Sequence, residues 1–273
     1  MAFCWKSIDY QTPKVMGILN VTPDSFFDGG SYLSESDISE RIENMIEQGA
    51  DIIDIGAYSS QPGADDISTE EELSRLKKSL CVIKKDFPDI PVSIDTFRLD
   101  IVKSVLDFFG EIMVNDISGG NHDSEMIEFT AKHNLPYVCM HMQGNPQTMQ
   151  TNPQYENVVS EVLDFFKTKL SEAQKFNHQQ FIIDPGFGFG KTVEQNYELM
   201  NHLNVFSELR TPILVGISRK SMIQKVINCN ANNALNGTTV LNTIALLKGA
   251  NILRVHDVKE AKEAVTIVSN YFI

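Results

Sequence analysis

Eight short apolar runs, each ending at a residue that can hydrogen-bond or carry charge, are the feature that most restricts the fold of this chain. Segments of helical periodicity separate most of the runs. Their polar ends are Asn20, Asp54, Asp95, Asn115 with Asp116, His141, Asp184, Ser218 with Arg219 and Lys220, and His256. Alternating strands and helices predict a parallel sheet. Polar residues at the C-terminal ends of buried strands are typical of a (β/α)8 barrel, which keeps its chemistry there.

The expected strands form one barrel from the whole chain. We expect strands at 14–21, 51–56, 91–95, 112–116, 136–141, 181–184, 212–217 and 251–255, with residues 1–13 capping the barrel or leading into it. The 273-residue chain has no linker or shift in composition, and such barrels use about 250 residues as one domain. The prediction is a single (β/α)8 TIM barrel over residues 1–273. Capping boxes of Thr69 with Glu72 and of Thr192 with Gln195 are expected to begin two helices.

Charge and composition exclude several classes of partner. The formal net charge is −13 and the pI is about 4.9, whereas nucleic acids and anionic membranes bind basic surfaces. No apolar run resembles a signal peptide or is long enough to span a bilayer. The four cysteines are widely spaced with no CxxC pair, which argues against a disulfide scaffold or a zinc ribbon. We expect a cytoplasmic protein with no nucleic-acid or membrane partner, in which Cys81 and Cys139 are buried.

Four basic residues come from the ends of the last two expected strands: Arg219, Lys220, Arg254 and His256. Phosphate sites of (β/α)8 barrels frequently use this corner. Arginine offers a forked donor to phosphate oxygens and lysine a point charge. The pattern favours an anion site, although Arg219 and Lys220 could instead be solvated charges at the start of a helix.

Acidic and amide residues end the strands across the barrel mouth. Asp95 and Asp184 end the third and sixth expected strands, and Asn115 ends the fourth between them. A carboxylate accepts two parallel hydrogen bonds, so this set suits a heterocycle with an amino group beside ring N–H groups. Alternatively, each aspartate could cap the helix that follows it.

A glycine-rich segment, PGFGFGK, follows Asp184. Its alternating glycines permit unusual dihedral angles and close backbone approach. Phe187 and Phe189 could present an aromatic face to a ring, and at least one of them is expected to fill the core. The sequence has no Walker A run and no histidine spacing typical of a metal site. His141 is expected to be structural.

At these residues the sequence resembles the dihydropteroate synthase family, which are pterin-binding (β/α)8 barrels. The resemblance extends from about Val15 to Ala264. It is carried by GILNVTPDSFFDGG (17–30), DIIDIGAYSSQPGA (51–64), VSIDTFR (92–98), VNDISGG (114–120), MHMQGNP (140–146), DPGFGFGK (184–191), GISRKSMI (216–223) and RVHDV (254–258). These strings are long, ordered and chemically unusual.

The resemblance implies that p-aminobenzoate is joined to 6-hydroxymethyl-7,8-dihydropterin pyrophosphate, with release of pyrophosphate and formation of 7,8-dihydropteroate. The family mechanism is dissociative: pyrophosphate leaves first, and the pterin stabilises a methylene cation. Electrostatic preorganisation then does most of the catalytic work. Sulfonamides that mimic p-aminobenzoate are the inhibitors that the resemblance implies.

The resemblance also implies roles for individual residues. The pterin would be held by Asp95, Asn115, Met140, Asp184, Phe189 and Lys220. The pyrophosphate would be held by Asn20, Ser60, Arg254 and His256, with Mg²⁺ bound at Asn20. The p-aminobenzoate pocket would contain Phe26, Ser60, Gln61, Pro62, Phe189, Ser218 and Lys220. The expected catalytic residues are Asp95, Lys220, Arg254 and His256, and loops 22–33 and 57–68 would close over the site.

One position departs from the family pattern. The family usually has Ser-Thr-Arg-Pro-Gly in the second loop, whereas this chain has Ser59-Ser60-Gln61-Pro62-Gly63. Gln61 lacks the guanidinium that would help to hold pyrophosphate. A charge-assisted hydrogen bond is roughly twice as strong as a neutral one, so we expect altered loop closure and an altered response to sulfonamides.

Two other functions share parts of this pattern. A methyltetrahydrofolate:corrinoid methyltransferase would share Asp95, Asn115 and Asp184, but has less use for a pyrophosphate corner. A pterin-binding paralogue with impaired catalysis is suggested by Gln61 alone. The resemblance also implies a homodimer, with Val240, Ile244, Leu247, Val265 and Val268 as candidate contacts.

Overall fold

The computed structural model describes residues 4–5, 8–22, 34–59, 66–144 and 153–271. Eight parallel strands form its central sheet: β3 (Lys14–Asn20), β4 (Ile52–Gly56), β5 (Val92–Asp95), β6 (Met113–Asp116), β7 (Tyr137–Met140), β8 (Phe181–Asp184), β9 (Leu214–Val215) and β10 (Ile252–Val255). They are hydrogen-bonded in the order β8-β7-β6-β5-β4-β3-β10-β9. A parallel bridge between Ile183 and Ile213 joins β8 to the residues before β9. The predicted (β/α)8 barrel is thereby confirmed.

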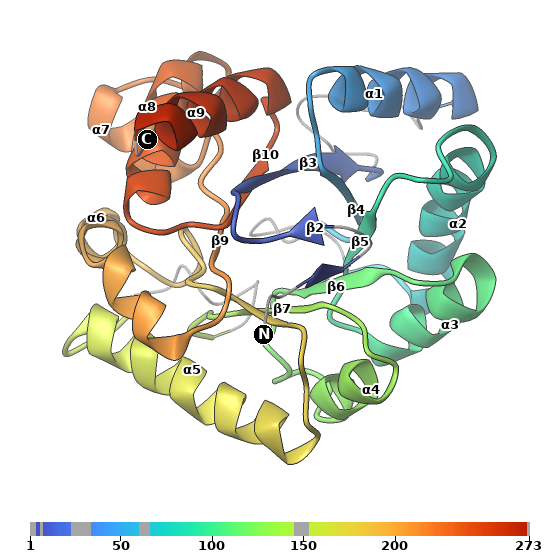
Figure 1. The fold of residues 1–273 in the computed structure, drawn as a ribbon, viewed down its shortest axis with the longest axis horizontal. Helices are drawn as coiled ribbons and strands as arrows, with labels where there is room; N and C mark the ends of the chain where they lie inside the picture. The colour runs from blue at the N-terminus through green and yellow to red at the C-terminus, as the bar shows by residue number, and fades with distance from the viewer. Residues whose placement is uncertain (1–3, 6–7, 23–33, 60–65, 145–152, 272–273) are drawn as a thin grey trace.

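The helices surround this barrel (Figure 1). They are α1 (Glu35–Glu47), α2 (Thr69–Asp86), α3 (Leu99–Phe109), α4 (Met126–Lys132), α5 (Val158–Lys175), α6 (Val193–Asn201), α7 (Ser221–Ile227), α8 (Leu235–Leu247) and α9 (Val258–Tyr271). Short 3-10 helices lie at η1 (Leu203–Leu209) and η2 (Ala231–Asn233). Apolar residues between the helices and the outer face of the sheet form the larger core cluster. None of the described helices is long and apolar enough to span a membrane.

The structure differs from three local expectations: the N-cap of α2, the length of the seventh strand and the burial of Cys81. Ser68, rather than Thr69, caps α2 by accepting from the Glu71 N–H at 3.2 Å. The strand expected at 212–217 is reduced to two residues, since Pro212 has no N–H to donate and the chain turns after Val215, with the Lys220 N–H donating to the Ile217 carbonyl. Cys81 lies on the exposed side of α2, whereas Cys139 is buried as expected. The capping box of Thr192 with Gln195 is confirmed.

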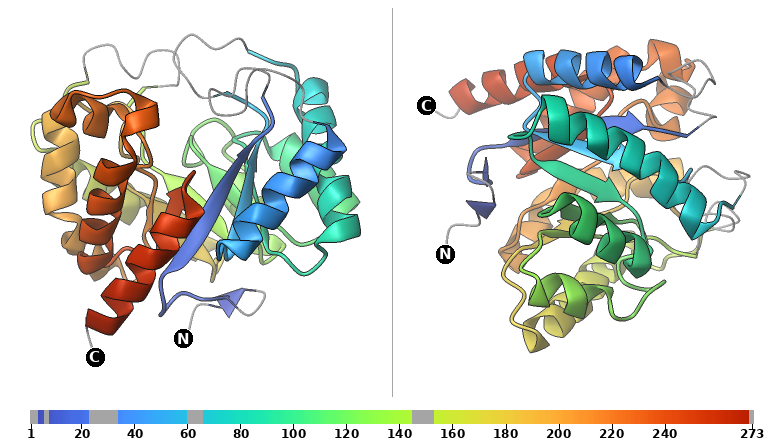
Figure 2. Two further views of the ribbon diagram at one scale, coloured as in Figure 1. Left: turned by 90° about the horizontal axis from the view of Figure 1, so that it is seen from above. Right: turned by 90° about the vertical axis from the view of Figure 1, so that its right-hand side faces the viewer.

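A short antiparallel hairpin closes the N-terminal end of the barrel. Its strands are β1 (Cys4–Trp5) and β2 (Ile8–Asp9). The left view of Figure 2 shows the hairpin at the end opposite to the one toward which β3 points. Its residues Trp5, Ile8 and Tyr10 join inward-facing strand residues in a second buried cluster, the barrel floor. The expected capping role of this segment is confirmed.

The barrel floor determines which residues face the mouth. Its strand members are Met16, Ile52, Met113, Val138, Ile182, Leu214 and Ile252. Successive side chains of a strand point to opposite faces, so the residue two positions later faces the same interior. Counting two residues beyond six of these floor residues gives Asp54, Asn115, Met140, Asp184, Gly216 and Arg254. One apolar layer therefore orients most of the polar groups at the mouth.

Candidate active site

Arg254 joins three strand ends across the barrel. Its Nε donates to Asp54 Oδ2 at 2.6 Å, and its Nη2 donates to Asp95 Oδ2 at 2.6 Å. Asn115 Nδ2 donates to the same Asp54 oxygen at 3.2 Å. Residues from β4, β5, β6 and β10 therefore form one hydrogen-bonded group. We call these four residues, with Asp184 and Lys220, the polar cluster.

Burial controls the charges in this part of the cluster. Burial raises the pKa of Asp95 to about 7, although the Arg254 guanidinium opposes the shift. Burial alone would lower the pKa of Arg254, but the carboxylates of Asp54 and Asp95 raise it above its ordinary value. Asp54 Oδ1 is buried without a hydrogen-bond partner among the described residues. This oxygen is an acceptor that a donor on a ligand can satisfy.

The remaining members of the polar cluster meet at the glycine-rich segment. Asp184 Oδ1 accepts from the Gly186 N–H at 2.8 Å. Lys220 Nζ donates to the Phe187 carbonyl at 2.6 Å and lies 4.4 Å from the centroid of the Phe189 ring. Burial raises the pKa of Asp184, an effect that Lys220 opposes. Burial lowers the pKa of Lys220 to about 8, an effect that Asp184 opposes.

Distances from Gly216 and Gly56 show that Arg254 lies near Lys220 and that Asn20 lies near Asp95. A Cβ atom at Gly216 would lie 3.8 Å from Arg254 Cβ and 3.9 Å from Lys220 Nζ. A Cβ atom at Gly56 would lie 3.3 Å from Asn20 Oδ1 and 3.7 Å from Asp95 Oδ2. The structure thus brings the expected residues of strands β3, β5, β6, β8 and β10 to one place, together with Lys220.

His256 and Ser218 lie at the same end of the barrel. The His256 N–H donates to Ser218 Oγ at 3.2 Å. Burial lowers the pKa of His256 to about 4, and Arg254 adds to the effect. His256 is therefore neutral at pH 7. It can offer a hydrogen bond to an anion but contributes no positive charge.

Arg219 does not belong to the basic corner. Its guanidinium forms two hydrogen bonds with Asp257, at 2.8 and 2.7 Å, and donates to the carbonyls of Ala231 and Asn232 at 2.8 Å each. The expectation that it contributes to an anion site was wrong, because its side chain holds the η2 segment instead. Positive charge at the site comes from Lys220 and Arg254.

The aromatic and apolar residues of the site divide between core and surface. Phe187 is fully buried, which confirms that one of the two phenylalanines fills the core, whereas Phe189 is only partly buried. Met140 is buried on β7, and a Cβ atom at Gly186 would lie 3.3 Å from its Cγ. The predicted residues Phe26, Ser60, Gln61 and Pro62 lie outside the described residues.

Glu72, Thr96, Arg98 and Asp66 form a second hydrogen-bonded group, which joins α2 to the segment after β5. Glu72 is buried and accepts from Thr96 Oγ1 at 2.6 Å and from Arg98 Nη1 at 2.8 Å. Arg98 Nη2 also donates to Asp66 at 3.0 Å, and its guanidinium lies 5.2 Å from the Tyr58 ring. Glu72 was expected to cap α2, but it ties that helix to the residues that follow Asp95. A cavity of about 360 Å³ is lined by Tyr58, Asp66, Phe97, Arg98, His122 and others.

Two buried residues near the mouth were missed as functional candidates. Asp54 was recognised as a strand end but given no role, although it bonds both Arg254 and Asn115. Its position two residues after the floor residue Ile52 is the signal that could have found it. Lys191, the last residue of PGFGFGK, is buried directly behind Asp184 and Phe189.

Comparison with known proteins agrees with this geometry. The sequence profile of the family described as pterin binding enzyme matches residues 16–256. Dihydropteroate synthase of Escherichia coli K12 is 41% identical over 264 residues, which cover 96% of this chain and 93% of that protein. The corresponding protein of Haemophilus influenzae is 40% identical, with 96% and 95% covered.

Solved structures give the same result. Yersinia pestis dihydropteroate synthase, in a complex with a sulfonamide drug, has a TM-score of 0.91 and 37% identity, covering 97% of this chain and 96% of that one. The Xanthomonas albilineans enzyme with 4-aminobenzoic acid has a TM-score of 0.88 and 33% identity, covering 97% and 95%. These matches extend over nearly the whole chain. The chain belongs to the dihydropteroate synthase family of pterin-binding enzymes.

Proposed function

We propose that the polar cluster catalyses the synthesis of 7,8-dihydropteroate from p-aminobenzoate and 6-hydroxymethyl-7,8-dihydropterin pyrophosphate. One observation carries the proposal: acceptors from β4, β5, β6 and β8 lie beside Lys220 and Arg254 at one end of the barrel. The acceptors match the amino and ring N–H groups of a pterin. The cations lie where a leaving anion needs charge.

The pterin is held by Asp95, Asn115, Asp184 and Lys220, with Met140 and Phe189 packing against it. Ionised Asp184 accepts N–H groups of the ring. Asp54, which the structure adds to this set, accepts from Asn115 through Oδ2, and its buried Oδ1 has no hydrogen-bond partner among the described residues. A pterin that donates hydrogen bonds to Asp54 and Asp95 competes with Arg254 for these two carboxylates. The guanidinium of Arg254 that it displaces can then turn toward the pyrophosphate.

The substitution occurs at the methylene carbon of the pterin. Its bond to the pyrophosphate oxygen breaks, and the electron pair leaves with pyrophosphate. The amine nitrogen of p-aminobenzoate then bonds to the cationic methylene and loses one proton to solvent. Arg254 stabilises the negative charge of the leaving pyrophosphate, and neutral His256 donates a hydrogen bond to it. Asp95 stabilises the methylene cation. The p-aminobenzoate is held by Phe189, Ser218 and Lys220, with Phe26, Ser60, Gln61 and Pro62 completing its pocket.

Asn20 is the proposed protein ligand for Mg²⁺. The described residues contain no group of three or more His, Cys, Asp or Glu side chains able to hold a metal ion. Mg²⁺ usually keeps several waters and binds through few protein groups plus substrate phosphates, so the single amide oxygen of Asn20 at the end of β3 fits that role. When bound, the ion neutralises phosphate oxygens of the pyrophosphate.

The test is a product assay with pterin pyrophosphate, p-aminobenzoate and Mg²⁺. We expect equal amounts of dihydropteroate and pyrophosphate, and loss of both with Asp184→Asn. Methyl transfer to a corrinoid without pyrophosphate release would support the methyltransferase instead. Pterin binding without turnover would support an inactive paralogue. The identities near 40% to dihydropteroate synthases over nearly the whole chain favour the first outcome.

Since the Yersinia pestis enzyme binds a sulfonamide drug, we propose that sulfonamides compete with p-aminobenzoate here as well.

We also propose a homodimer formed through α8 and α9. Val240, Leu247 and Ile267 are exposed large apolar residues on these helices, and exposed apolar groups of this kind favour association. Val265 and Val268 are buried against the barrel, so the expectation that they form contacts was wrong. Analytical ultracentrifugation tests the dimer, and a monomer at assay concentration contradicts it. The proposed compartment remains the cytoplasm.

A further inference from the structure

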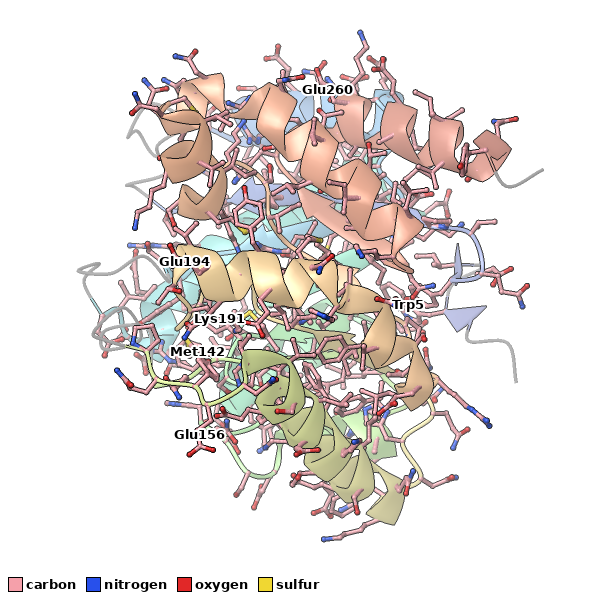
Figure 3. All side chains as sticks on the ribbon, turned by 90° about the vertical axis from the view of Figure 1, so that its left-hand side faces the viewer. Trp5, Met142, Glu156, Lys191, Glu194 and Glu260 are labelled. Carbon is pink, nitrogen blue, oxygen red and sulfur yellow. The ribbon has the colours of Figure 1, made fainter. Side chains whose placement is uncertain are left out.

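Lys191 is a buried lysine that the proposed reaction does not use. Burial lowers its pKa to about 7, an effect that Asp184 opposes. The Lys191 side chain lies just before the N-cap of α6 and is 4% exposed. Figure 3 shows it near Met142 at the start of that helix, with Trp5 toward the other end of the barrel. Within the described part of the chain, Lys191 forms no ion pair with a carboxylate within 4.0 Å. A buried charge is costly unless hydrogen bonds compensate it.

The compensation comes from main-chain carbonyls. Lys191 Nζ donates to the carbonyls of Gly186 at 2.9 Å, Phe189 at 3.0 Å and His141 at 3.4 Å. It also lies 3.1 Å from Nδ1 of His141. Burial lowers the pKa of this histidine, so its neutral ring can accept a hydrogen bond at Nδ1. Because a lysine ammonium has three N–H groups, they are shared among these four acceptors, of which the His141 carbonyl is the farthest. The amino group of Lys191 thus connects the glycine-rich segment to His141, the residue that follows β7.

The glycine-rich segment needs such an anchor because its backbone is unusual. Gly186, Gly188 and Gly190 have φ angles of 69°, 81° and 57°. A Cβ atom at Gly190 would lie 2.6 Å from the Gln143 carbonyl oxygen, and one at Gly186 would collide with the His141 carbonyl. The segment therefore packs backbone against backbone, where few side chains can hold it in place. Asn196 supplies a second anchor by accepting from the Gly188 N–H at 2.7 Å.

The same segment places two members of the polar cluster. The Gly186 N–H holds Asp184, the Phe187 carbonyl holds Lys220 Nζ, and the Phe189 ring lies over that nitrogen. Lys191 also acts on Asp184 by charge, since it is among the cations that oppose the rise of the Asp184 pKa. Removing the Lys191 amino group would therefore loosen the positions of Asp184 and Lys220. When that group is protonated, its removal also takes away a charge that favours ionised Asp184.

We propose that Lys191 is a positioning residue for pterin recognition, which fixes residues 185–190 so that Asp184 and Lys220 meet the ring together. This inference rests on the proposed function, because it assigns these two residues to the pterin. A purely structural lysine would affect the amount of folded protein but not the affinity of the folded molecules. The two roles therefore differ in a measurable way.

The experiment compares Lys191→Met with wild type. Equilibrium binding of a pterin is measured by calorimetry, kcat and both KM values by product assay, and the melting temperature by calorimetric scan. We expect the pterin Kd and the KM of the pterin pyrophosphate to rise on the order of tenfold or more, because small displacements of binding groups cost up to about 10²-fold. Folded Lys191→Met with a wild-type pterin Kd overturns the proposal, whatever its melting temperature.

Two further variants make the result decisive. Lys169→Met is the matched control, because Lys169 is a second buried lysine, on α5, whose nearest carboxylate is Glu172 at 3.7 Å. It should lower the melting temperature without changing the pterin Kd. Lys191→Gln keeps N–H donors but not the charge, and should give an intermediate pterin Kd. If Lys191→Met does not fold, an unchanged pterin Kd in Lys191→Gln overturns the proposal.

These measurements separate the two proposals. A wild-type protein that binds pterin but forms no dihydropteroate contradicts the proposed function, while its pterin Kd still tests Lys191. An active wild type with unchanged affinity in the Lys191 variants contradicts the positioning role alone.

Discussion

The two ends of the barrel are built from the same strands but with opposite chemistry. At the N-terminal end, Trp5, Ile8 and Tyr10 of the hairpin pack on seven apolar strand residues. Two residues further along these strands, the side chains that point to the same interior are polar: Asp54, Asn115, Asp184 and Arg254. The floor contributes hydrophobic burial, which is non-directional. The mouth contributes hydrogen bonds whose distances and partners matter. Mutations at the two ends should therefore separate stability from catalysis.

The largest effect is expected at the mouth, from Arg254→Met. This change removes the cation for the leaving group and leaves Asp54 and Asp95 without their shared partner. We expect kcat to fall on the order of 10²- to 10³-fold, as when one electrostatic donor to a reacting oxygen is lost. Product formation by quenched assay measures this loss. Activity within about threefold of wild type would contradict the role of Arg254 in leaving-group stabilisation.

A large effect of the opposite kind is expected at the floor, from Trp5→Ala. Trp5 is 2% exposed, and truncation of a buried tryptophan costs roughly 3–5 kcal/mol of unfolding free energy. Urea titration followed by far-UV circular dichroism measures the loss. Per folded molecule, kcat and both KM values should stay at the wild-type level. A fall in kcat without a fall in stability would show that the two ends are not separable.

These two ends also differ in how far the sequence could predict them. The strand ends and their order follow from short apolar runs that stop at polar residues, which are local properties, so the barrel and most of its polar mouth could be predicted. The direction of side chains at turns could not be predicted from the sequence. Arg219 has a φ angle of 56° and turns toward Asp257, although Lys220 beside it faces the site. Asp54 was given no role because IIDIG does not indicate its distant partner, Arg254, and because its inward direction follows only once Ile52 is assigned to the barrel floor.

The pH dependence of kcat/KM should also distinguish the mouth from the floor, because Asp95 and Lys220, the groups that titrate near neutral pH, lie at the mouth. Asp95 must be ionised to accept pterin N–H groups, and its pKa is raised to about 7 by burial. Lys220 must be protonated, and its pKa is lowered to about 8 by burial. The value of kcat/KM for the pterin pyrophosphate should therefore rise as the pH increases through about 7 and fall as it passes about 8.

Steady-state rates across pH 5–10 in constant-ionic-strength buffers measure this profile. The matched variant is Asp95→Asn, which should retain low activity but lose the limb on the acidic side. An acidic limb that persists in Asp95→Asn would assign that limb to another group. Trp5→Ala, at the floor, should keep the wild-type profile.

The smallest effect is expected from Gln61→Arg, which restores the residue usual in the family. Residue 61 lies outside the described residues, so this prediction rests on the sequence. A charge-assisted hydrogen bond to pyrophosphate adds about 1 kcal/mol over a neutral one, so kcat/KM should rise by several-fold and sulfonamide inhibition constants should shift. Gln61→Lys adds charge without the forked geometry and serves as the control. Identical kinetics and inhibition in wild type and Gln61→Arg would remove any special role for this position.

The apolar hairpin has a consequence for the order of events in a catalytic cycle. Because Trp5 and its neighbours block the N-terminal end, both substrates must arrive, and all products must depart, by the same route. Whatever occupies the deepest position, next to Asp54 and Asn115, has to arrive first and leave after anything seated above it. With the substrates placed as proposed, the bicyclic ring binds before the aromatic amine, because the ten residues of the barrel floor close the opposite route.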